Sequence, residues 1–166
     1  LRRLSAAYVG SLPFDGFAIG GSLGKDTAEL LRLLSTLMPL LPADRPNHLL
    51  GIGDVGSIRG AVLHGVDTFD STFPTRNARH GTLLTFDARR WGGDRFNVAR
   101  REHAEALEPP DETCPCALCR EHTVAYLHHL FRANEPIAVT LAATHNLHHM
   151  GRLMARTRDA ILRDEI

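Results

Sequence analysis

Three cysteines crowd into one short segment, Cys114-Pro115-Cys116-Ala117-Leu118-Cys119. Thiolates in the pattern C-x-C-x-x-C can converge on one metal ion, and zinc completes such a set with a fourth protein ligand. The histidines that could supply it are His122, His128, His129, His145, His148 and His149. His122 is so close to the cysteines in the sequence that one turn would have to hold all four ligands. His145, at the predicted start of the last helix, would join two segments, as structural zinc does. The alternative interpretation is three buried free thiols.

A carboxylate and two arginines form a second candidate site. Asp70 ends an apolar segment, and Arg76 and Arg79 follow in what reads as a cationic loop. A carboxylate at a strand end can act as nucleophile, general base or metal ligand, and otherwise it caps a turn or helix. Arginine suits bidentate contacts to phosphate, although such a loop can also simply be solvated. Together these residues predict chemistry on an anionic substrate that carries phosphate, such as RNA.

The elements that must position Asp70 lie in the first 87 residues. Apolar runs predict strands at 16–20, 48–53 and 66–70, and helical spacing predicts helices at 26–38 and 54–64. Asp26 and Glu29 form a capping-box pattern at the first helix, and Gly65 is a suitable stop for the second. Strand, helix, strand, helix, strand indicates a parallel α/β sheet with crossover helices. Since a full barrel needs about 250 residues, this is either part of a barrel or a small open sheet.

Composition excludes several classes of protein. Apolar residues make up 43% of the 166 residues, which is ordinary for a globular protein. No uncharged apolar run of about 18 residues exists, so we expect no membrane span. The 19 basic and 19 acidic side chains give a net charge of zero, so any nucleic-acid surface must be local. The odd, crowded cysteines indicate a reducing, cytoplasmic compartment rather than a disulfide framework.

The chain begins with Leu1, and we expect it to start inside a longer gene product. Further helices are predicted at about 119–134 and 145–163.

Several segments, in their order and spacing, resemble the tRNA-guanine transglycosylase (queuine tRNA-ribosyltransferase) family. They are GFAIGG (16–21), LPADRPNHLLGIG (41–53), GVDTFDSTFPTRNARHG (65–81), CPCALC (114–119) and HNL (145–147). The resemblance implies the C-terminal part of a (β/α)8 TIM-type barrel with an inserted zinc-binding subdomain. It implies barrel elements and active-site loops in 1–88, the zinc subdomain in 89–149 and a C-terminal helix in 150–166. The implied activity replaces guanine at the anticodon wobble position of tRNA with a 7-deazaguanine base such as preQ1 or queuine.

The resemblance also implies roles for single residues. Asp70 falls on the family's nucleophile, which forms a covalent ester with the ribose in a double displacement. The turn of Gly20, Gly21 and Ser22 would present backbone groups to the base, and Arg76 and Arg79 would contact phosphates of the tRNA anticodon loop. One structural Zn²⁺ per chain would be held by Cys114, Cys116, Cys119 and His145.

The resemblance covers the C-terminal half of the family. Its general-base aspartate and base-reading residues lie in the other half, so we expect a partial enzyme that is inactive alone. The turn Gly-Gly-Ser-Leu-Gly-Lys is one residue shorter than the family's GGLAVGE. A homodimer with no membrane partner is implied. The alternatives are a non-catalytic zinc-binding subunit that docks tRNA or a partner chain, and a zinc-stabilised RNA-binding module acting alone. Retention of Asp70 disfavours the non-catalytic subunit.

Overall fold

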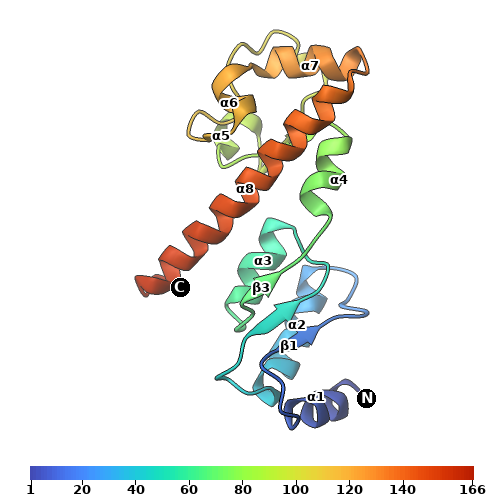
Figure 1. The fold of residues 1–166 in the computed structure, drawn as a ribbon, viewed down its shortest axis with the longest axis vertical. Helices are drawn as coiled ribbons and strands as arrows, with labels where there is room; N and C mark the ends of the chain where they lie inside the picture. The colour runs from blue at the N-terminus through green and yellow to red at the C-terminus, as the bar shows by residue number, and fades with distance from the viewer. The chain divides into compact units, whose positions relative to one another are not determined.

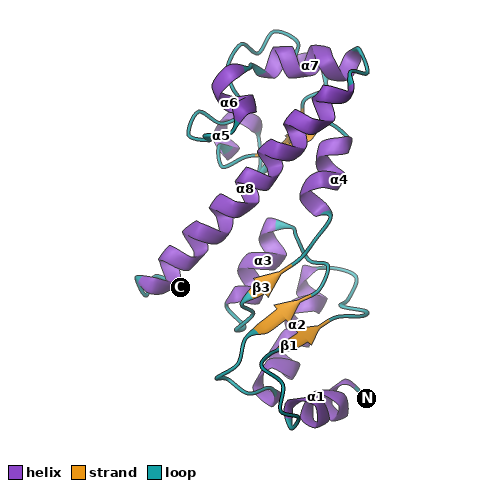
Figure 2. Cartoon of the chain, viewed as in Figure 1, coloured by secondary structure: helices purple, strands orange, loops and turns teal.

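A computed structural model describes residues 1–166, and they divide into two compact units. The first unit comprises Leu1–Thr72 and the second comprises Phe73–Ile166. Figure 1 colours the first unit from blue to green and the second from green to red. The secondary structure is a mixture of helices and small sheets (Figure 2), which confirms the α/β prediction at that level.

The first unit is built on a parallel sheet. Its elements are α1 (Arg2–Gly10), β1 (Phe17–Ile19), α2 (Thr27–Leu37), the 3-10 helix η1 (Met38–Leu40), β2 (Asn47–Leu49), α3 (Val55–Val62) and β3 (Thr68–Phe69). The strand order is β1-β2-β3, with His48 paired to Ala18 on one side and to Thr68 on the other. The predicted parallel sheet with crossover helices is therefore confirmed.

Local signals in the sequence explain why these helices begin and end where they do. The Asp26 carboxylate accepts a hydrogen bond from the Glu29 backbone N–H at 2.8 Å, and Asp54 does the same for Ser57 at 2.9 Å. Gly65 follows α3 with a φ of +89°, a conformation that glycine adopts without strain. The apolar core of this unit consists of Ile19, Leu30, Leu34, Leu37, Leu49, Ala61 and Val66. The strands thus bury one face, which contains Ile19 and Leu49, and leave the face of Ala18 and Thr68 exposed.

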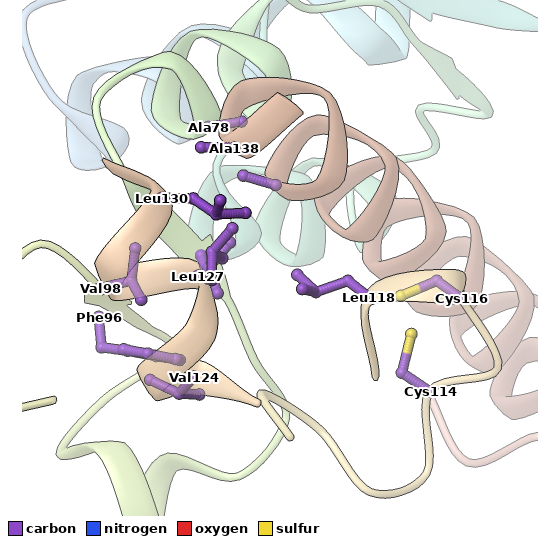
Figure 3. Packing of buried hydrophobic residues seen from close by; sticks show 12 residues of the cluster. Ala78, Phe96, Val98, Cys114, Cys116, Leu118, Val124, Leu127, Leu130 and Ala138 are labelled. Carbon is purple, nitrogen blue, oxygen red and sulfur yellow. The ribbon is translucent and has the colours of Figure 1, made fainter. Parts of the chain in front are cut away.

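The second unit packs short elements around one long helix. Its elements are α4 (Phe73–Arg79), β4 (Thr82–Leu84), α5 (Ala88–Trp91), β5 (Arg95–Asn97), the 3-10 helix η2 (Arg101–His103), α6 (Ala117–Glu121), α7 (Val124–Arg132) and α8 (Pro136–Leu162). Strands β4 and β5 pair antiparallel. Helix α8 has 27 residues and contacts α4, α6, α7 and β4. The core cluster includes Leu83, Val98, Leu118, Leu127 and Ala142, and Cys114 and Cys116 lie at its edge (Figure 3).

Two of the predicted helices have the wrong boundaries. The helix predicted at 119–134 is two helices, because Thr123 caps a new one by accepting from the Tyr126 backbone N–H at 3.1 Å. The helix predicted at 145–163 begins at Pro136, a residue type that suits the first helical position because it lacks an N–H. His145 therefore lies in the middle of α8 and not at the start of a helix.

No helix of the structure is both long and apolar enough to cross a membrane. The domain boundaries predicted after residues 88 and 149 stay predictions.

Candidate functional site

The structure brings the four predicted metal ligands together. The sulfur atoms of Cys114, Cys116 and Cys119 and a ring nitrogen of His145 all lie within 4.8 Å of one another. Ligands of a tetrahedral zinc with bonds of about 2.0–2.3 Å stand about 3.5–3.8 Å apart, so a small contraction would complete such a shell. The sulfurs of Cys114 and Cys116 point toward one another beside Leu118 (Figure 3). The set of three sulfurs and one imidazole therefore fits a metal ion that prefers tetrahedral soft ligands.

An ion pair with one buried partner holds the segment that leads into the cysteines. The Asp111 carboxylate accepts from the Thr113 backbone N–H at 2.8 Å and from its hydroxyl at 2.7 Å. Arg152 of α8 donates to the same carboxylate at 2.8 Å, and Asp111 is buried. Cys116 then precedes the first residue of α6, and Cys119 lies within that helix. The turn and the short helix aim all three sulfurs at α8.

A hydrogen bond on the side of the ring away from the cysteines fixes the orientation of His145. Its Nε2 lies 2.8 Å from the Leu84 carbonyl, and Nδ1 lies 3.2 Å from the Cys119 sulfur and 3.5 Å from the Cys116 sulfur. Because a carbonyl only accepts, Nε2 carries the proton and Nδ1 faces the thiol cluster as the ligating atom. A ligating histidine whose other nitrogen is held by a carbonyl is the usual arrangement at metal centres.

The next residue of α8 binds the backbone of the same strand. Asn146 is fully buried; its side-chain oxygen accepts from the Leu84 backbone N–H at 2.9 Å, and its Nδ2 donates to the carbonyls of Pro74 and Thr82 at 2.9 Å each. Strand β4 is thus bound to α8 through two consecutive side chains. The position of the His145 ring depends on this strand.

Hydrogen bonds within the cluster leave one sulfur ionised, and a bound metal ion would displace the protons of the other ligands. The hydrogen bond from the Cys119 thiol lowers the pKa of Cys116 to about 3, with a further contribution from His145 and against the effect of burial. The same bond raises the pKa of Cys119, which is its donor. Burial acts against a charge on His145, but its hydrogen bonds with Cys114 and Cys116 raise its pKa to about 9. A thiolate is the form that binds metal, so one sulfur is ready to do so.

Three of the other candidate histidines face other groups. Those contacts are His122 stacked on Tyr126 with ring centres 4.8 Å apart, His128 hydrogen-bonded to the Val98 carbonyl at 2.8 Å, and His149 stacked on Phe86 at 4.0 Å. Only His145 belongs to the group of four.

Asp70 directly follows β3, at the carboxyl end of the parallel sheet. Its Oδ1 accepts from the Gly51 backbone N–H at 3.1 Å and from His48 Nε2 at 3.1 Å. The Gly51 bond, followed by that of His48, lowers the pKa of Asp70 below its ordinary value of 3.8. The side chain is 61% exposed. The structure therefore presents an ionised, accessible and oriented carboxylate, as a nucleophile or an electrostatic stabiliser requires.

The other candidate residues occupy two different units. Gly21 of the predicted base-binding turn has a φ of +80°, and the carbonyls of Gly20 and Ser22 accept hydrogen bonds from the Arg2 guanidinium. Arg76 and Arg79 are exposed and lie one turn apart on α4 of the second unit. The prediction of a cationic loop is wrong in this respect, because the segment is helical.

Two contributors to these sites were absent from the sequence predictions. His48 binds Asp70, and the contact needs the pairing of 48 with 68, which places His48, Thr68 and Asp70 on one face and which the sequence does not fix. Asn146 anchors β4, and no local pattern distinguishes it from other helical asparagines.

These observations define an α/β protein with an aspartate at the end of a parallel sheet and a buried Cys3His group. A family model described as queuine tRNA-ribosyltransferase matches residues 1–166. The chain is 48% identical over 166 residues to the queuine tRNA-ribosyltransferase of Protochlamydia amoebophila, covering 100% of this chain and 41% of that protein. It is 43% identical to the protein of that name from Chlamydia felis, covering 99% and 43%, and 44% identical to that of a Roseiflexus species, covering 98% and 40%.

The chain therefore belongs to the queuine tRNA-ribosyltransferase family. It spans about two fifths of the length of the curated relatives it matches. The family resemblance found in the sequence is confirmed.

Proposed function

We propose that these residues take part in base exchange on tRNA, in which guanine at the anticodon wobble position is replaced by a 7-deazaguanine such as preQ1 or queuine. The observation that carries the proposal is Asp70, an ionised and exposed carboxylate at the carboxyl end of a parallel sheet in a chain of this family. Enzymes built on parallel barrel strands keep their chemistry at that end.

The reaction is a double displacement at C1′ of the target ribose. A carboxylate oxygen of Asp70 bonds to C1′ while the C1′–N bond breaks, and guanine leaves with the electron pair and takes up one proton. The incoming base then loses a proton, its nitrogen bonds to C1′, and the electron pair of the ester bond returns to Asp70. Two inversions give net retention, by the logic of retaining glycosidases. The negative carboxylate also stabilises the cationic character of the sugar at each transition state.

Binding of the two substrates is assigned to different residues. The turn of Gly20, Gly21 and Ser22 faces the base through its backbone, since glycine lets a ligand approach closely. Arg76 and Arg79 contact the phosphates that flank the target nucleotide. Their exposure and their position one helical turn apart support this role. The forked guanidinium matches two phosphate oxygens.

The Cys3His group holds one structural Zn²⁺. Three thiolates and one imidazole suit zinc, and four protein ligands leave no position for substrate. Bound there, the ion cross-links the cysteine segment, α6 and α8. It takes no part in the exchange itself.

The architecture that best accommodates these assignments is the C-terminal part of a (β/α)8 barrel. In it 1–88 contribute barrel elements, 89–149 a zinc subdomain and 150–166 a terminal helix. The general base and the side chains that read the base come from residues outside these 166, so the chain acts as part of an enzyme. That enzyme forms homodimers, as the family resemblance implies. We place the activity in the cytoplasm, where thiols stay reduced.

The direct test is incorporation of isotope-labelled guanine into tRNA by the longest natural chain that carries these residues. We expect incorporation by the unaltered protein and a decrease of a thousandfold or more in Asp70→Asn. Binding of tRNA without exchange would contradict the proposal and favour a non-catalytic docking subunit. Equal exchange by both proteins would exclude Asp70 as the nucleophile.

A further inference from the structure

A chain of side-chain hydrogen bonds runs along the exposed face of the sheet to Asp70. The Thr68 hydroxyl lies 2.8 Å from His48 Nδ1, and His48 Nε2 lies 3.1 Å from Asp70 Oδ1. The ladder produces this alignment, because His48 of β2 pairs with Thr68 of β3 and Asp70 stands two residues further on the same face. The register of two neighbouring strands thus brings an imidazole to the candidate nucleophile.

The chemistry of the three groups sets the direction of the bonds. An ionised carboxylate only accepts, so Nε2 of His48 must donate to Asp70. In the neutral ring Nδ1 is then an acceptor, and the Thr68 hydroxyl donates to it. Thr68 therefore selects the tautomer of the imidazole that can hold the carboxylate.

Both hydrogen bonds to Asp70 converge on one oxygen. The Gly51 backbone N–H and His48 Nε2 each donate to Oδ1 at 3.1 Å. Two donors from different positions of the chain restrict rotation of the carboxylate and orient Oδ2 away from them. They also stabilise the carboxylate as the group that must leave when the second base attacks.

We propose that His48 is a positioning residue for Asp70: it holds Oδ1 so that Oδ2 attacks the ribose, with Thr68 fixing its tautomer. This inference rests on the proposed function. His48 does not touch the ribose, and it acts through the carboxylate alone. Enzymatic displacement depends on alignment of the reacting atoms. Loss of the His48 side chain therefore lowers the rate of the chemical step more than it weakens substrate binding.

A purely structural role makes different predictions. The His48 side chain is 32% exposed, and the pairing of β2 with its neighbours uses backbone groups. Its replacement should therefore leave the melting temperature within about 3 °C. A matched control is His64→Leu, which removes an imidazole bound only to the Gly60 carbonyl, at 2.8 Å.

The test compares His48→Leu, His48→Gln, Thr68→Val and His64→Leu in the longest natural chain that carries these residues, with tRNA and labelled guanine. For His48→Leu we expect kcat to fall about 10–100-fold with KM for tRNA within about twofold. Gln places an amide N–H near the position of Nε2, so His48→Gln should recover most of the rate. Thr68→Val should lose about threefold, and His64→Leu should match the unaltered protein.

Three outcomes would overturn the positioning role: an unchanged kcat in His48→Leu, a loss confined to KM, or no recovery in His48→Gln with the melting temperature preserved.

Failure of the proposed function looks different, since the unaltered protein would then exchange no guanine. In that case the ¹⁵N NMR signals of His48 still test the contact. The contact requires a proton on Nε2 in the neutral ring and a change of the signals in Asp70→Asn. A neutral ring protonated on Nδ1 would refute it.

Discussion

Asn146 is fully buried and makes three hydrogen bonds to the backbone, so its loss should cost the second unit stability with little change in volume. Replacement by leucine keeps the size of the side chain but removes one acceptor and two donors. Two backbone groups of β4, the Leu84 N–H and the Thr82 carbonyl, lose their partner. The Pro74 carbonyl loses one of two, because it lies in the first turn of α4 and keeps its intrahelical bond. A buried polar group left without a partner costs about 1–3 kcal/mol, and a lost hydrogen bond to a group that keeps another partner costs about 1 kcal/mol, so the total is about 3–6 kcal/mol.

The single tryptophan provides the assay. Trp91 belongs to the second unit and stacks on Phe96 with ring centres 4.1 Å apart, so its fluorescence reports the unfolding of that unit in guanidinium chloride. Asn146→Leu should lower the free energy of unfolding by about 3–6 kcal/mol. Thr140→Leu puts the same side chain on an exposed position of α8 and should stay within about 0.5 kcal/mol.

A second variant separates the donors from the acceptor. Asn146→Asp keeps an oxygen for the Leu84 N–H but turns an acceptor toward two carbonyls, so it should destabilise at least as much as Asn146→Leu. A loss below about 1 kcal/mol in either variant would show that the backbone groups of β4 find other partners, and it would refute this role of Asn146.

Three further predictions concern the metal, the arginines and the charge of the nucleophile. Cys116→Ser should release the bound zinc and lower the melting temperature by about 10 °C, and fewer than about 0.2 zinc per chain in the unaltered protein would refute the site. Arg76→Ala and Arg79→Ala should each flatten the salt dependence of tRNA binding by about one charge and leave affinity for the free base unchanged; an equal loss of base affinity would refute phosphate contacts. The pKa of Asp70 should lie below 3.8 in a ¹³C NMR titration and rise toward that value in His48→Leu. A lowered pKa in the folded state means that the carboxylate stabilises the fold above pH 3.8 and that this contribution is lost as the pH falls through the lowered value. A pKa at or above 3.8 would contradict the hydrogen bonds described.

The sequence predicts the first unit better than the second, for physical reasons. Short-range signals define the first unit: the caps at Asp26 and Asp54, the turn at Gly65, and apolar runs of strand length. Parallel pairing follows from the alternation of strands and helices. The three cysteines of the candidate metal group are equally accessible, because C-x-C-x-x-C is hard to explain by packing alone. The pattern leaves the fourth ligand open, and only the family resemblance implies His145.

The second unit depends on contacts between residues far apart in the chain. The start of α8 differs from the prediction although Pro136 is a local signal for a first helical turn, and it is Ala138 and Ala142 of these turns that enter the core of the second unit. The role of Asn146 arises from bonds to residues 62–72 positions away. The contact of His48 with Asp70 needs the register of β2 and β3, which apolar runs indicate only to within a residue or two.

The most direct measurement of the central claim is detection of the covalent bond between Asp70 and tRNA. The longest natural chain that carries these residues is mixed with an anticodon-arm RNA, with no incoming base supplied and released guanine removed by dialysis, then denatured and weighed by mass spectrometry. We expect a protein–RNA adduct that survives denaturation, maps to the peptide containing Asp70 and is absent from Asp70→Asn. An adduct that persists in Asp70→Asn, or that maps to another carboxylate such as Asp67, would contradict it.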